Sequence, residues 1–180
     1  MQTDLLQEAR RQAEICNACR YCEGYCSVFP ALHQERFFTD GNLTQLANLC
    51  HNCRGCYYAC QYTAPHEFDL NLPKALAEVR QDSWERFAWP GPLAQIFQKN
   101  GVMIAVATVL GFAVLFLAMR TLGSAGGDGF YAVLSHNAMV AIFLPAFLFP
   151  LFSIAIGLRR YWQGTDGKRI TLAHIVGAFG

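Results

Sequence analysis

The eight cysteines of this 180-residue chain form two identical patterns, and both patterns lie in its first third. Each pattern reads C-x2-C-x2-C-x3-C, as CNACRYCEGYC over residues 16–26 and CHNCRGCYYAC over residues 50–60. Such spacing lets three thiolates of one loop reach three irons of a cubane, while the fourth cysteine ligates the other cluster in two-cluster ferredoxins. The sequence therefore predicts two [4Fe–4S] clusters with crossed ligation. The two predicted ligand sets are Cys16, Cys19, Cys22 and Cys60, and Cys50, Cys53, Cys56 and Cys26.

Zinc and disulfide bonds are the two other uses of so many cysteines. A structural zinc site takes four ligands in two pairs, which leaves the repeated third and fourth cysteines unexplained. Disulfides are typical of secreted proteins, whereas residues 1–14 are polar and charged and have no apolar signal-peptide core. Iron–sulfur ligation explains the spacing better, and reduced thiols then indicate the cytosolic side of a membrane.

Two arginines and two histidines close to the cysteines are further candidates for a role at the site. Arg20 and Arg54 follow the second cysteine of their motifs. Charge and hydrogen bonding tune the potential of a cluster, so these arginines are candidates to raise it or to contact a partner, and ordinary solvated loop charges are the alternative. His51 and His66 resemble Rieske-type ligands only in residue type. Because eight cysteines suffice for two clusters, we expect surface or hydrogen-bonding roles for both histidines.

The first half of the chain has no convincing strand period and is predicted to be all-α. Helices are expected over residues 4–16, 43–49 and 71–89. Asn71 is the expected cap of the last helix, and its expected buried stripe is Leu72, Leu76, Val79 and Phe87. No proline directly follows the fourth cysteine of either motif, and the linker at 27–49 has room for helices. Both features favour a helical ferredoxin over the compact β-containing type.

A change of composition after the run WPGP predicts two domains, at residues 1–92 and 93–180. From residue 101 to 158 only Arg120 and Asp128 are charged. Apolar stretches at about 102–120 and 131–158 are long enough to cross a bilayer, and residues 93–100 are expected along its surface. Buried helices of a large soluble protein are the alternative, but too little other chain is present to cover them. A third span is expected to start at about 170, in a protein longer than this chain.

Basic residues predict how these spans are oriented. Lys99 precedes the first span, and the residues that follow the second are Arg159, Arg160, Lys168 and Arg169. Cytoplasmic loops carry an excess of such residues, so the cysteine-bearing domain is expected on the cytoplasmic side. The net charge of +1 gives no argument for nucleic acid, which normally needs a basic patch.

His136 and His174 are the candidate ligands for haem b. Ionisable residues inside a membrane are costly and usually functional, and histidine is a common axial ligand of haem. His136 lies near the non-cytoplasmic end of the second span and His174 near the cytoplasmic start of the third, so each needs a separate partner ligand. The alternatives are an interfacial His136 near Tyr131 and a quinone site to which no residue is assigned.

The segment around the cysteines resembles the tricarballylate-utilisation protein B family, also called CitB-type. The similar strings cover about residues 13–92 and are ICNACRYCEGYC, FTDGNL, LANLCHNCRGCYYACQY, PHEF and NLPKALAEVR. The apolar half resembles the family in layout alone. Members are helical ferredoxins fused to a haem-type membrane domain akin to the nitrate reductase gamma subunit, with more membrane helices than this chain shows.

The resemblance implies an electron-transfer subunit in the bacterial inner membrane. Its donor is implied to be an FAD-dependent dehydrogenase that oxidises tricarballylate to cis-aconitate, and its acceptor haem or quinone. A subunit of another oxidoreductase, heterodisulfide-reductase-like or related to cobalamin synthesis, is the first alternative. A membrane-bound iron–sulfur redox sensor is the second, although no output domain is recognisable in these residues. No nucleophile or general-base constellation is present, so no catalytic site is predicted.

Overall fold

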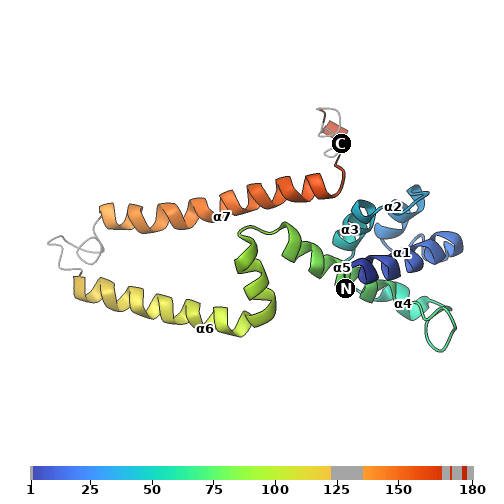
Figure 1. Cartoon of the computed structure of the whole chain (residues 1–180), viewed down its shortest axis with the longest axis horizontal. Helices are drawn as coiled ribbons and strands as arrows, with labels where there is room; N and C mark the ends of the chain where they lie inside the picture. Colours follow the sequence, from blue (N-terminus) through green and yellow to red (C-terminus); the bar gives the residue numbers. More distant parts are fainter. Residues whose placement is uncertain (1, 123–135, 168–170, 172–175, 178–180) are drawn as a thin grey trace. The chain divides into compact units, whose positions relative to one another are not determined.

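The computed structural model describes residues 2–122, 136–167, 171 and 176–177. Over these residues the chain forms seven helices and no strand (Figure 1), which confirms the all-α prediction. The helices are α1 (Gln2–Cys19), α2 (Val28–Gln34), α3 (Asp40–Leu49), α4 (Gly55–Ala59), α5 (Leu72–Phe87), α6 (Gly91–Leu122) and α7 (His136–Gly164). The chain divides into two compact units, Met1–Arg86 together with Arg160–Gly180, and Phe87–Arg159.

The apolar core of the first unit is built by four helices. The helices α1, α2 and α3 contact one another, and α5 adds its predicted stripe to the same core. Leu32 and Leu43 are 0% exposed and Leu76 is 1% exposed, and each such burial contributes about 1.5–3 kcal/mol to folding. The prediction for the α5 stripe is confirmed except at its end, because Phe87 is only half-buried. The buried core residues are Ala9, Ala13, Val28, Phe29, Leu32, Phe38, Leu43, Leu46, Ala47, Leu72, Ala75, Leu76 and Val79.

Polar side chains determine where α3 and α5 begin. The hydroxyl of Thr39 accepts a hydrogen bond from the amide of Asn42 at 3.2 Å, ahead of α3. The side-chain oxygen of Asn71 accepts one from the amide of Lys74 at 3.2 Å, which confirms the predicted cap. Each such cap contributes about 1 kcal/mol because it satisfies a backbone donor that has no partner in the helix.

Three helical segments differ from the sequence-based expectation. The helix α1 continues past residue 16 to Cys19, so it carries the first two cysteines. The helix α2 lies in the linker at 27–49, where the sequence predicts room for helices but no particular helix at these residues. Pro30 is the third residue of α2, where a backbone N–H has no partner within the helix, so a proline is tolerated there. The short helix α4 lies inside the second cysteine motif and was not expected either.

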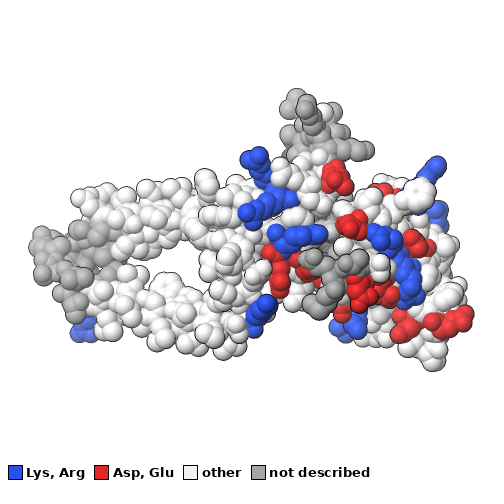
Figure 2. All heavy atoms as spheres, viewed as in Figure 1, with Lys and Arg blue, Asp and Glu red and all other residues white. Residues whose placement is uncertain are grey.

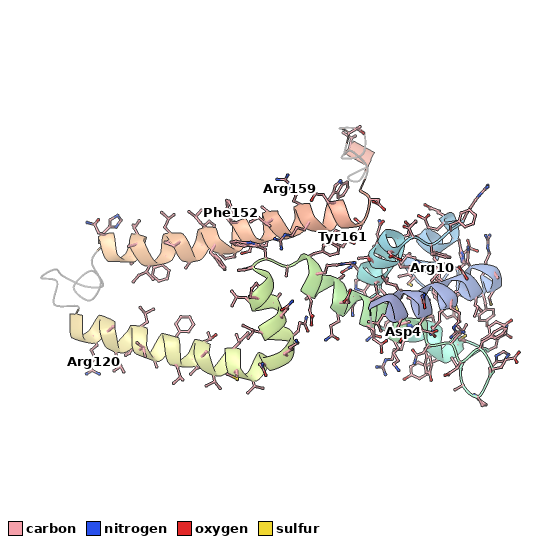
Figure 3. The ribbon with its side chains drawn as sticks, viewed as in Figure 1. Asp4, Arg10, Arg120, Phe152, Arg159 and Tyr161 are labelled. Carbon is pink, nitrogen blue, oxygen red and sulfur yellow. The ribbon has the colours of Figure 1, made fainter. Side chains whose placement is uncertain are left out.

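The helices α6 and α7 are long and apolar enough to cross a membrane, by length and composition. The candidate spans are Gly91–Ala118 and Met139–Gly164, and no residue of their most apolar stretches is buried. Figure 2 shows both helices almost entirely white, with Lys, Arg, Asp and Glu gathered over the first unit. In Figure 3, Arg120 marks the last turn of α6 and Phe152 lies along α7. At 1.5 Å per residue, both helices exceed the ~30 Å hydrocarbon core.

A kink divides α6 into a short and a long part. Asn100 has φ −138° and ψ 47°, which are not helical values. Before the kink, residues 91–99 form a separate short helix. Its apolar side chains are on the outside, since Leu93, Ile96 and Phe97 are 52%, 46% and 60% exposed. Its predicted position along a membrane surface stays a prediction. The predicted loop after α6, residues 131–135 and most of the expected third span lie outside the described residues.

We predict that replacing Leu76 by alanine lowers the free energy of unfolding by about 2–5 kcal/mol, because a cavity remains where a fully buried side chain was. Denaturant unfolding of the chain in detergent, followed by helical circular dichroism, measures the loss. Lys74→Ala on the same helix is the control, since Lys74 is exposed and forms only a surface ion pair with Glu78 at 4.0 Å. Equal effects of the two substitutions would contradict the assignment of Leu76 to the core.

Candidate iron–sulfur site

The two cysteine motifs occupy equivalent places on the helical core. The first and third cysteines of both motifs pack against the core, and these are Cys16, Cys22, Cys50 and Cys56. The second cysteines, Cys19 and Cys53, are exposed. In each motif the first cysteine lies at the end of a helix. Cys16 lies in the last turn of α1, and Cys50 directly follows α3. The two sequence repeats therefore produce two similar local structures.

Both motifs turn sharply after the second cysteine. Arg20 has φ 55° and Arg54 has φ 61°, values in the left-handed region that residues with a side chain seldom adopt. The turn reverses the chain, so the third cysteine returns to the core beside the first. Two backbone amides also point at sulfur, from Asn52 to Cys50 Sγ and from Tyr62 to Cys60 Sγ, both at 3.4 Å. Such N–H···S contacts favour a negatively charged sulfur.

Two cavities bring cysteines of the two motifs together. The first is lined by Cys16, Cys19, Cys22 and Cys60. The second is lined by Cys26, Cys50, Cys53 and Cys56. Each cavity thus has three cysteines of one motif and the fourth cysteine of the other, and these are the two sets that the spacing predicted. The assignment of these side chains as iron ligands stays a prediction.

The donor set fits a cluster better than a single metal ion. Among the described residues, no three His, Cys, Asp or Glu side chains lie close enough to hold one ion. A zinc ion draws four sulfurs to about 2.3 Å from one centre, whereas a cubane carries its irons at separate corners and spreads the sulfurs apart. All eight cysteines are free thiols, and they surround cavities instead of meeting at one point.

Burial and mutual repulsion oppose ionisation of the thiols. Burial raises the pKa of Cys16 to about 12, and negative charge on Cys60 of the other motif adds to the effect. Burial likewise raises the pKa of Cys56 to about 12, and Cys22 is the largest charged contributor there. The pKa of Cys22 is also raised, by burial first and by Cys60 second. A cationic group in the cavities is needed to hold these side chains as thiolates, because metal binding displaces thiol protons.

Hydrogen bonds from outside the motifs hold both loops. Asn17, inside the first motif, donates to the carbonyl of Glu35 at 3.1 Å, and its oxygen accepts from His33 Nδ1 at 3.0 Å. In the second motif, the guanidinium of Arg80 on α5 donates to the carbonyl of Cys50. Sequence reasoning missed all three partners. The cysteine spacing carries no signal for them, because they come from α2, the residue directly after it and α5, which all lie outside the motifs.

The other predicted site residues have separate positions. His66 Nδ1 accepts a hydrogen bond from the amide of Phe68 at 3.1 Å, which confirms a hydrogen-bonding role. His51 is exposed and lines the second cavity. His136 is the first residue of α7, and its role as a haem ligand stays a prediction. His174 lies outside the described residues.

Comparisons with known proteins agree with this site. Residues 9–85 match the family model described as the citrate utilization protein B Fer4-like domain. Citrate utilization protein B of Escherichia coli is 41% identical over 162 residues, which cover 87% of this chain and 42% of that relative. The chain thus spans less than half the length of the relative. No solved structure matches the chain. Residues 9–85 therefore form a Fer4-like domain, and the chain is similar to the corresponding part of citrate utilization protein B.

Proposed function

We propose that the chain is a membrane-anchored electron-transfer subunit with two [4Fe–4S] clusters. The observation that carries this proposal is the pair of cavities, each lined by three cysteines of one motif and the fourth of the other. A further cavity is lined by cysteines of both sets, Cys16, Cys22, Cys56 and Cys60. Because this cavity has cysteines of both predicted ligand sets, it supports electron transfer over a short distance between two redox groups. The clusters supply the one-electron chemistry when bound, and the chain holds them, orients them and sets their surroundings.

We predict that double substitutions will distinguish crossed from uncrossed ligation. With crossed ligation, Cys16→Ala with Cys60→Ala removes two ligands of one cluster, so about four of about eight irons remain. Cys16→Ala with Cys26→Ala removes one ligand from each cluster, so the iron content falls toward zero. Iron analysis and EPR of anaerobically purified chain measure the difference.

Uncrossed ligation gives the opposite pattern, with iron retained when Cys16 and Cys26 are both replaced. Zinc in place of iron in the unmodified chain would overturn the cluster proposal as a whole. A Lys74→Ala chain, which changes an exposed side chain of the same unit, controls for loss of iron through handling.

The second part of the proposal places the iron–sulfur domain on the cytoplasmic side of the bacterial inner membrane. The candidate spans in α6 and α7 support a membrane anchor. Lys99 lies at the start of the apolar part of α6, and Arg159 and Arg160 lie near the end of α7, whereas Arg120 lies near the other end of α6. This excess of basic residues at one end of the pair agrees with the positive-inside rule.

We predict that protease added to inside-out membrane vesicles removes the iron–sulfur domain, because the domain is then on the outer surface. In right-side-out vesicles the same protease should leave it intact. An immunoblot against residues 1–86 measures both results, and detergent-opened vesicles provide the control for cleavage. Cleavage in right-side-out vesicles alone would reverse the proposed orientation.

The third part of the proposal concerns the electron donor and acceptor. The relative is named for citrate utilization, and both citrate and tricarballylate are tricarboxylates. We infer that the donor is an FAD-dependent dehydrogenase that oxidises a tricarboxylate such as tricarballylate to cis-aconitate. This oxidation releases two electrons and two protons to the flavin, and the chain takes up the electrons singly. The acceptor is haem b, with His136 as a candidate ligand, or quinone in the membrane.

We predict that tricarballylate dehydrogenase and its substrate reduce the clusters of the membrane-bound chain under anaerobic conditions. Bleaching of the iron–sulfur absorbance measures the transfer, and the chain with Cys16→Ala and Cys26→Ala is the control without clusters. A b-type α band that is lost in His136→Ala would assign haem as the acceptor, while cluster reoxidation by quinone without such a band would assign quinone. Clusters that stay oxidised with the reduced flavoprotein would contradict the proposed donor.

A further inference from the structure

An arginine of α5 contacts the second cysteine motif and not the first. Arg80 is half-buried, and its guanidinium donates a hydrogen bond to the carbonyl oxygen of Cys50. Cys50 is the first cysteine of its motif and lines the second cavity. An arginine side chain keeps its positive charge in proteins. A fixed positive charge therefore lies against the backbone of one predicted ligand loop.

The equivalent carbonyl in the first motif has a neutral partner. Cys16 is the first cysteine there, and its carbonyl oxygen accepts the backbone amide of Arg20 at 3.0 Å. The side chain of Arg20 is exposed and donates to the carbonyl of Asn17 at 3.2 Å. Arg54 holds the equivalent exposed position in the second motif. Each loop has one exposed arginine at the same place, and the first loop also carries the exposed carboxylate of Glu23. Arg80 adds a positive charge to the second loop from outside its motif.

The packing of α5 on α3 holds Arg80 in place. Ser83 donates to the carbonyl of Arg80 at 2.7 Å, and Asn48 donates to the Ser83 hydroxyl at 3.1 Å. Asn48 also donates to the carbonyl of Thr44 at 2.8 Å, so α3 and α5 are joined immediately before Cys50. The inner face of α5 carries Leu76 and Val79, and both side chains are buried in the core. Arg80 is thus carried by a rigid element and not by a mobile loop.

We propose that Arg80 raises the potential of the cluster at Cys26, Cys50, Cys53 and Cys56 above that of the other cluster, and so directs electrons toward it. This inference rests on the proposed function. Reduction adds one negative charge to a cluster, and a nearby cation stabilises that charged state. Solvent exposure also raises the potential of this cluster relative to the other. Cys26 and Cys53 are both exposed in this set, whereas Cys19 is the one exposed cysteine of the other set.

The direction of transfer follows from this difference in potential. With clusters bound, an electron received from the donor flavin at the set Cys16, Cys19, Cys22 and Cys60 would pass to the set next to Arg80, where the guanidinium would favour the reduced state, and no bond would form or break. Arg80 is a positioning residue in this scheme, since its contact is with the backbone of the loop and not with the reacting atoms.

An anaerobic redox titration of the full chain, followed by EPR, tests the order of the two potentials. Cys53→Ser identifies the cluster near Arg80, because it alters or removes the signal of that cluster alone. We expect the altered signal to be the one with the higher potential in the unmodified chain. If it is the one with the lower potential, the inference is overturned. A chain with fewer than two clusters would instead contradict the proposed function.

Substitution of Arg80 tests the cause of the difference. Arg80→Gln keeps a hydrogen-bond donor but removes the charge, so it should shift the higher potential downward and narrow the gap to the other signal. Arg80→Lys keeps the charge and should retain most of the gap. Arg86→Gln is the matched control, because Arg86 lies on the same helix and donates to the Thr44 hydroxyl at 3.2 Å, outside both motifs.

Three results would overturn the role of Arg80. They are an unchanged gap in Arg80→Gln, an equal narrowing in Arg80→Gln and Arg80→Lys, and an equal narrowing in Arg86→Gln. Iron content is measured on every variant. If Arg80→Gln loses iron, the order of the potentials in the unmodified chain and the gap in Arg80→Lys decide the question.

Discussion

The contact between the cysteine motifs and the helical core is the interaction on which the rest of this structure depends. Cys16, Cys22, Cys50 and Cys56 pack directly against the apolar side chains of α1, α2, α3 and α5. Folded proteins are only marginally stable. Because these cysteines pack on the core, the same side chains contribute to the stability of the fold and to the site. The left-handed turns at Arg20 and Arg54 are tolerated because this packing and the adjoining helices hold the chain on both sides.

Electrostatic repulsion between cysteine side chains is the second constraint on the site. Eight thiols lie around two neighbouring cavities, and burial together with the charge of other cysteines raises the pKa of Cys16 and of Cys56. Iron offsets this repulsion when it binds, which couples cluster binding to the stability of the unit. The contacts around the two motifs differ, although the cysteine spacing of the motifs is the same. A neutral amide meets the carbonyl of Cys16, whereas a guanidinium meets the carbonyl of Cys50.

The two units use apolar residues in opposite ways. In the first unit they are enclosed, as Leu32, Leu43 and Leu76 show. In the second unit they are exposed along both long helices, for example Phe116, which is 64% exposed, and Phe152, which is 66% exposed. Exposed apolar surface of this extent is typical of a contact with a membrane or with another protein. A polar cysteine-bearing domain joined to such helices is the arrangement that the proposed electron relay at a membrane requires.

The amino-acid sequence by itself determined the two cysteine sets, the all-helical class, the cap at Asn71 and the apolar stretches, because each of these is a local pattern of spacing or periodicity. It did not determine α2, where Pro30 resembles a break but occupies a first turn that tolerates it. Nor did it indicate the partners of the loops. Arg80 is 30 residues from Cys50 in the chain, and no spacing rule connects them. Only the packing of α5 against α3 brings that charge to one of two motifs that share the same cysteine spacing, so the tertiary structure decided this difference between the two sites.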